Sequence, residues 1–142
     1  MVKNIKQIHK EDIVLVKIGK FFYCYGKDAY IISYFFNSKL KILENNIYSC
    51  GFPSQALNKV ISKLENNKVN YIISDRRNNY EIEEEENFKN LNKYEEFYEK
   101  AKKEIALKLR IEKINLYLLG NINKDKIKEK IYEIEKVIEN DK

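Results

Sequence analysis

The pattern of hydrophobic and polar positions predicts mixed strands and helices in the first part of the chain. Residues 12–18 and 21–25 are β-branched and aromatic runs, each followed by a glycine, which is typical of buried strands. Apolar residues within 27–36 recur at helical spacing, so this segment is predicted to be a helix. By the same criteria we expect strands at 40–43, 46–50, 69–74 and 80–82, and a helix at 54–64 capped by Ser54.

From Glu83 onward the apolar residues recur at helical spacing to the end of the chain. The acidic run Glu83–Glu86 is expected to open a helix, where negative charge favours the positive end of the helix dipole. Gly120 is the expected stop of a long helix, and Asn123 the cap of a second one. The second helix carries one apolar seam that we expect to be buried, formed by Ile127, Ile131, Ile134 and Ile138.

The order of these elements predicts an α+β protein with a mixed β-sheet flanked by helices. Residues 1–82 form the expected α/β domain, and residues 83–142 a helical extension that ends as a C-terminal helical hairpin. The chain has 142 residues, of which 44% are hydrophobic, enough for one core.

The basic charge is concentrated in one half of the chain. Residues 1–80 contain 13 Lys or Arg and 6 Asp or Glu, a net charge of +7, whereas residues 81–142 have a net charge of −2. Such an excess favours a polyanionic partner, although an abundance of lysine, isoleucine and asparagine is also what an AT-rich genome imposes. With two cysteines and no apolar run long enough to span a membrane, we expect a reduced, cytoplasmic protein without membrane contact.

Motifs for catalysis or cofactor binding are missing from the sequence. There is no phosphate-binding glycine loop, no dinucleotide fingerprint and no nucleophile elbow, and His9 is the single histidine. Cys24 and Cys50 have no histidine nearby in the sequence, so neither is expected to be a nucleophile. We therefore expect no enzyme activity, no cofactor and no metal site.

The segment 19–29 (GKFFYCYGKDA) places aromatic side chains between glycines and beside lysines. Aromatic rings can stack on bases or wedge between them, while lysines reach phosphates. In a strand, Phe21 and Tyr23 share one face and Phe22 the other, and alternation alone does not decide which face is exposed, because both carry aromatics. The candidate nucleic-acid-binding residues are Phe21, Tyr23, Lys17, Lys20 and Lys27.

In order along the chain, these segments resemble the N-terminal mismatch-recognition domain (domain I) of MutS-type DNA mismatch repair proteins. Residues 14–29 resemble the family segment Gly-Asp-Phe-Tyr-Glu-Leu-Phe and the Asp-Ala that follows it. Residues 51–56 (GFPSQA) resemble Gly-Ile-Pro-Tyr-His-Ala, and residues 57–64 and 69–76 resemble the helix and strand that come next. The resemblance covers about residues 10–82, and the family has no counterpart of residues 83–142.

The resemblance implies that Phe21 matches the aromatic residue that wedges into the DNA stack at a mismatch. Tyr23 stands where the family has the glutamate that binds the displaced base, and Lys20 where it has an aspartate. The resemblance therefore implies affinity for nucleic acid, with DNA favoured over RNA, but not mismatch discrimination.

Two hypotheses follow for the function. The first is a non-catalytic, stand-alone nucleic-acid-binding module, an accessory protein of DNA or RNA processing such as DNA repair or a mobile or diversity-generating retroelement. The alternative is a protein-interaction adaptor that uses the C-terminal helices and has lost nucleic-acid binding. In either case residues 84–142 are candidates for binding a protein partner or for self-association.

Overall fold

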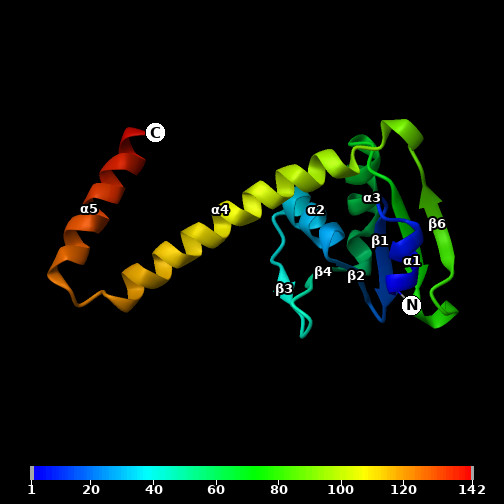
Figure 1. Cartoon of the computed structure of the whole chain (residues 1–142), viewed down its shortest axis with the longest axis horizontal. Coiled ribbons are helices and arrows are strands. Elements are labelled where there is room, and N and C mark those ends of the chain that lie inside the picture. The colour runs from blue at the N-terminus through cyan, green and yellow to red at the C-terminus, as the bar shows by residue number, and fades with distance from the viewer. Residues whose placement is uncertain (1, 142) are drawn as a thin grey trace. The chain divides into compact units, whose positions relative to one another are not determined.

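A computed structural model describes residues 2–141, which divide into two compact units, one ending at Glu104 and the other beginning at Ile105 (Figure 1). The elements are α1 (Val2–Ile8), β1 (Ile13–Ile18), β2 (Phe21–Tyr25), α2 (Lys27–Phe36), β3 (Lys41–Ile42), β4 (Tyr48–Pro53), η1 (Ser54–Ala56), α3 (Leu57–Asn66), β5 (Tyr71–Asp75), η2 (Arg76–Asn78), β6 (Ile82–Glu86), η3 (Lys89–Leu91), α4 (Tyr94–Gly120) and α5 (Asp125–Asn140).

The first unit is built on a mixed six-stranded sheet with the strand order β3-β4-β2-β1-β5-β6. β1 pairs in parallel with β5, and the other neighbouring strands are antiparallel. Because β1 and β5 are parallel, their carboxyl ends lie at the same edge of the sheet. The α+β class with a mixed sheet and flanking helices is therefore confirmed.

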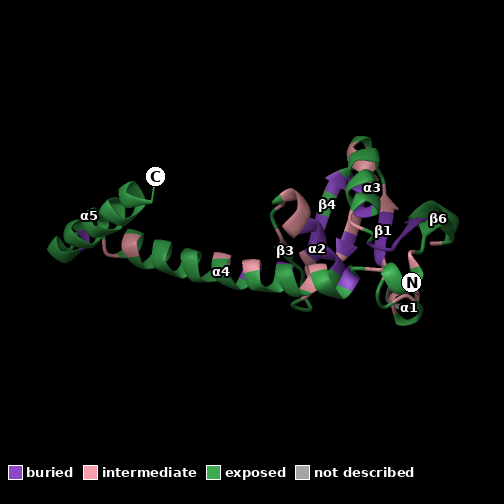
Figure 2. Cartoon of the chain, turned by 90° about the horizontal axis from the view of Figure 1, so that it is seen from above, coloured by how far each residue is buried: buried purple, intermediate pink, exposed green. Residues whose placement is uncertain are grey.

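The main core lies between one face of the sheet and the helices α2 and α3. Its side chains alternate along each strand, as in Ile13 and Leu15 of β1 and Tyr71 and Ile73 of β5. Figure 2 shows that the buried residues gather in the strands and in the helices packed on them. β1 and β5 are also buried on the opposite face, as Val14 of β1 shows, which explains their nearly continuous apolar sequence.

The acidic run Glu83–Glu86 does not open a helix, as we expected from its charge, but belongs to the edge strand β6. Its backbone pairs with β5, where Ile73 lies opposite Glu84 and Ile72 opposite Glu85. The outer edge of β5 needs a hydrogen-bonding partner, and a strand of exposed glutamates supplies one while discouraging further strand addition. The boundary expected after residue 82 thus falls inside a strand, and the compact unit continues to Glu104.

The helix after β4 also begins differently from the expectation. Ser54 opens the short η1 turn, and α3 starts at Leu57 without a side-chain capping hydrogen bond. Pro53, the last residue of β4, has an extended backbone with φ −63° and ψ 146°, and the η1 turn lies between it and the start of α3.

The second unit consists of the C-terminal part of α4 and the helix α5. We expected the α5 seam to be buried, and for three of its four residues this is wrong within one chain. Ile127 is 2% exposed, but Ile131, Ile134 and Ile138 are 37, 41 and 50% exposed. The two helices contact each other near the turn at 121–124, where Lys130 Nζ donates to Tyr117 Oη at 3.3 Å. The rest of the seam is only partly covered, and Ile134 lines an open groove together with Ile114 and Leu118 of α4.

Candidate nucleic-acid interface

The strand β2 exposes Phe21 and buries its neighbour Phe22. Phe21 is 43% exposed, whereas Phe22 is 4% exposed and Cys24 is fully buried. Phe22 points toward α2 and α3 and stacks on Phe52 of β4, with ring centroids 5.7 Å apart. The packing of the helices thus decides the point that alternation left open, and it leaves Phe21 on the face turned away from α2 and α3.

Tyr23 lies beside Phe21 on the same face, with ring centroids 6.2 Å apart. Its ring packs over Gly51 on β4, where a Cβ atom would come within 2.8 Å of Tyr23 Cε1. Gly51 therefore leaves the space that the Tyr23 ring fills. Tyr25 continues this aromatic row, and its partial burial, aided by the nearby phenol of Tyr80, raises the pKa of its hydroxyl.

Lys20 is the candidate lysine that the structure places next to Phe21. It lies in the turn between β1 and β2, which Gly19 enables with a φ of 64°. The Lys20 carbonyl oxygen accepts a hydrogen bond from the Ser54 backbone N–H at 2.9 Å, so the turn is tied to the end of β4. The Lys20 side chain is exposed at this edge.

Lys17 and Lys27 do not lie with Phe21. Lys17 stands opposite Phe22 in the strand register, and directly paired residues point to the same face of a sheet. The Lys17 side chain therefore projects from the same face as Phe22, and Phe21 projects from the other face. Lys27 follows the other end of β2. Its Nζ atom lies 3.6 Å from Glu95 Oε1 and 4.7 Å from the centroid of the Tyr98 ring. The three lysines therefore do not form one cluster.

Arg76 and Arg77 are cations that the sequence analysis treated as part of a turn and missed as site residues. They follow β5 directly, and since Lys17 on β1 pairs with Asp75 in parallel, they leave the sheet at the same edge as Lys20. Both side chains are exposed. The sequence signal that could have found them is a pair of adjacent arginines after a predicted strand. Their position at the same end of the sheet as Lys20 follows only from the parallel pairing of β1 and β5.

Asp75 anchors this arginine loop. Its carboxylate accepts from the Arg77 backbone N–H at 2.8 Å and lies 3.4 Å from Arg77 Nη2. These contacts, the backbone hydrogen bond foremost, lower the pKa of the Asp75 carboxyl. We define the basic edge as Lys20, Phe21, Arg76 and Arg77, with the aromatic row behind Phe21.

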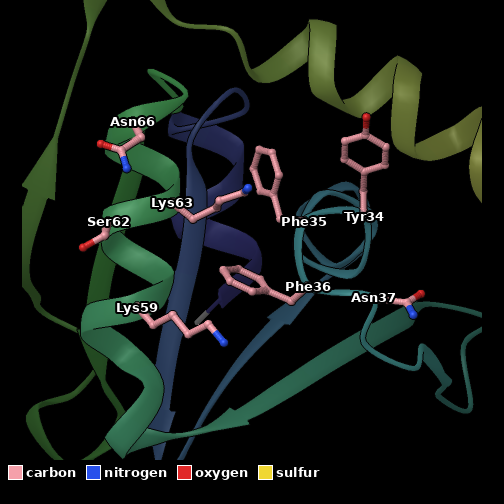
Figure 3. A pocket seen from close by; sticks show the side chains of 8 residues that line it. All are labelled: Tyr34, Phe35, Phe36, Asn37, Lys59, Ser62, Lys63 and Asn66. Atoms are coloured by element: carbon pink, nitrogen blue, oxygen red, sulfur yellow. The ribbon is translucent and has the colours of Figure 1, made fainter.

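A second surface that combines aromatic and basic residues lies on the other face, between α2 and α3. Figure 3 shows this groove of about 540 Å³, whose lining includes Phe35 and Phe36 of α2 and Lys59 and Lys63 of α3. The Lys63 ammonium lies 5.7 Å from the Phe35 ring centroid, and the groove's lining contains no acidic side chain. This groove is therefore the competing location for a polyanion.

Within residues 2–141, no group of three or more His, Cys, Asp or Glu side chains is arranged to hold a metal ion. No helix of the described chain is both long and apolar enough to cross a membrane. Cys24 and Cys50 are free and buried.

Comparison with known proteins covers the first unit. Residues 1–95 match the family described as MutS domain I, so the match extends from the N-terminus through the sheet to the first turn of α4. It therefore includes residues 83–95, for which we expected no counterpart in the family. No curated protein matches the chain significantly.

Proposed function

Since the chain belongs to the MutS domain I family, we propose that it is a non-catalytic nucleic-acid-binding module that uses the basic edge. The family is a recognition domain, and the fold seen here is consistent with it. The observation that carries the proposal is an exposed Phe21 ring at the end of the sheet where the exposed cations Lys20, Arg76 and Arg77 also lie.

The chemistry of this edge suits a nucleic acid. A flat apolar ring that projects from a rigid strand can stack on a base or wedge between two bases. The flanking cations would contact phosphates, which position the ligand without reading its sequence. The buried Phe22 beneath holds the strand in place, so the Phe21 ring is presented at little cost in ordering.

We further propose that DNA is the preferred ligand and that mismatch discrimination is lost. Family resemblance favours DNA, but Tyr23 occupies the position of the glutamate expected to bind the displaced base. Its ring is packed over Gly51 and presents a phenol there instead of a carboxylate. Lys20 adds a positive charge where the resemblance expects a negative one.

A salt-titrated binding assay tests this function. The ligands are a perfect duplex, the same duplex with one mismatch, the corresponding single strand, and a structured RNA. We expect binding to duplex DNA that weakens with salt, and equal affinity for the perfect and mismatched duplexes. Absence of binding to every ligand at low salt contradicts the proposal, and a clear mismatch preference contradicts the loss of discrimination.

Phe21→Ala is expected to weaken DNA binding by about 1–3 kcal/mol, the scale of one lost base stack. The melting temperature should change little, because the ring is exposed and packs mainly against Tyr23. Fluorescence anisotropy and thermal melting of the same preparation measure the two effects.

Phe22→Ala is the matched control on the other face of the strand. It removes a ring buried against Phe52 and is expected to destabilise the fold by about 3–5 kcal/mol. If Phe21→Ala instead lowers stability and leaves affinity unchanged, Phe21 is a structural residue and the basic edge is not the contact surface.

The biological setting of the module remains a separate prediction. An accessory role in DNA or RNA processing, including that of a retroelement, predicts that genes for such enzymes lie beside the gene for this protein. Examination of the neighbouring genes tests that role independently of the binding assay.

A further inference from the structure

The second unit exposes a large amount of apolar surface. Most of the exposed large hydrophobic side chains of the described residues lie after Glu104, on both α4 and α5. Ile111 and Ile114 of α4 are 56 and 54% exposed, and Figure 2 shows α5 exposed over nearly all of its length. Contiguous exposed apolar surface of this kind marks an interaction site.

The apolar residues form two seams with identical spacing. The α4 seam consists of Leu107, Ile111, Ile114 and Leu118, and the α5 seam of Ile127, Ile131, Ile134 and Ile138. Both advance in steps of four, three and four residues, which is the spacing of core positions in a coiled coil. The two seams therefore have equal length and the same kind of side chains.

The two seams are complementary when their helices run antiparallel. Leu118 then lies opposite Ile127 and Leu107 opposite Ile138, with the isoleucines of both seams facing one another between them. Beside the seams, the same register places Tyr117 against Lys130, and these two side chains already meet in the structure at 3.3 Å. At the far end it brings Lys108 and Glu135, which carry opposite charges, to flanking positions.

A single α5 covers only one face of α4. Leu109, Leu116 and Leu119 form a second exposed stripe. Leu109 and Leu116 each stand two residues from a seam residue, which places them about 200° around the helix, on the other side. Whether α5 closes on its own α4 or on that of another chain, this stripe still needs a further apolar helix to cover it.

We propose that residues 105–141 form a dimerisation element through which two copies of this chain associate as a four-helix bundle. Each copy contributes the C-terminal part of α4 and α5, so the α4 and α5 seams pair and the second α4 stripes of the two copies meet. We choose a second copy of this chain as the binding partner for two reasons. Each seam has a counterpart of equal spacing and length in the chain itself, and one α5 cannot cover the second stripe of α4. Charges of both signs alternate along these helices in nearly equal number, so two copies do not repel each other.

The dimer adds a property to the proposed function. Two copies carry two basic edges, which raises the effective affinity for a nucleic acid long enough to contact both. The association itself needs no nucleic acid, and its test is therefore independent of the binding assay.

Sedimentation equilibrium of the full chain without nucleic acid tests this proposal. We expect a mass of twice 17.1 kDa at micromolar concentrations. Ile114→Asp places a charge in the α4 seam and should yield a monomer, and Ile131→Asp should do the same from the α5 seam. Lys136→Asp is the control and should remain a dimer, because Lys136 is exposed and stands two residues from both Ile134 and Ile138, on the side of α5 opposite its seam.

The outcomes separate the proposal from its rivals. A monomeric full chain at all concentrations overturns it and indicates either a different protein partner or closure of α5 on its own α4. A dimer that persists in both Asp variants places the interface elsewhere and also overturns it. Near-ultraviolet circular dichroism should show that the N-terminal unit stays folded in the variants, because all tyrosines except Tyr117 and Tyr132 lie before Ile105. The second variant keeps the test valid if the first does not fold.

Discussion

Asp28→Ala is expected to destabilise the N-terminal unit by about 3–5 kcal/mol, the cost of breaking a buried ion pair by removing one partner. Asp28 is buried at the start of α2. Its carboxylate accepts from Lys6 Nζ at 2.9 Å, from the Val14 backbone N–H at 3.0 Å and from Tyr94 Oη at 2.6 Å. The substitution leaves all three donors without this acceptor, and it disconnects α1, β1 and α4 from α2.

Burial raises the pKa of the Asp28 carboxyl, while the Lys6 ammonium and the Tyr94 hydroxyl oppose that rise. The reciprocal effect raises the pKa of the Tyr94 phenol, since burial and the nearby carboxylate both disfavour its charged form. Because the hydroxyl remains protonated, it stays a hydrogen-bond donor to Asp28. The network thus fastens the first turn of α4 to the sheet.

Urea unfolding of Asp28→Ala measures this destabilisation. Asp125→Ala is the control, because Asp125 is also an acidic residue in the first turn of a helix but is exposed. It should change stability by at most about 0.5 kcal/mol, as is usual at the surface. Equal unfolding midpoints for the two variants would contradict the role of Asp28 as the acceptor that joins these elements.

The triple substitution Lys20→Ala, Arg76→Ala and Arg77→Ala is expected to cause the largest loss of DNA binding. Each phosphate contact contributes about 0.9 to the slope of log affinity against log salt for duplex DNA. If all three cations contact phosphates, the slope should fall by about 2–3 and the affinity at low salt should fall with it. Anisotropy titrations at several salt concentrations measure both quantities.

The control removes the same charge from α3 and the turn that follows it, with Lys59, Lys63 and Lys68 replaced by alanine. The net charge of the two triple variants is then equal, so a difference between them reports position rather than total charge. A smaller slope in the control than in the basic-edge variant would move the contact surface to the groove between α2 and α3. Equal slopes in both would show that binding follows net charge alone.

Much of the first unit could be predicted from local patterns. β1, β2, α2 and β5 lie close to the expected positions, because their apolar spacing reflects burial on one or both faces. The resemblance to MutS domain I, carried by short segments in a particular order, is confirmed by the family match over residues 1–95. Phe21 as the candidate wedge also came from that resemblance, and its exposure agrees with such a role.

Some of the predicted site depended on contacts between distant segments. Lys17, Lys20 and Lys27 are close in sequence, yet strand alternation and the length of β2 place them on different faces and ends of the sheet. Arg76 follows the same end of the sheet as Lys20 because β1 and β5 are parallel, and no local pattern encodes that pairing. Likewise, the sequence shows Asp28 only as an acidic residue near the start of a predicted helix, whereas the fold shows that it accepts hydrogen bonds from three other elements.

The sequence by itself determined where the chain forms most of its strands and helices and which family the first unit belongs to, because burial periodicity and short motifs are local properties. Tertiary structure decided which face of β2 is exposed, that the acidic run Glu83–Glu86 is an edge strand, and that the α5 seam is largely open within one chain. The reason is physical: helical spacing requires that an apolar face be covered, but it does not specify what covers it. For Phe22 the cover is α2 and α3 of the same chain, whereas for most of the α5 seam one chain supplies only partial cover.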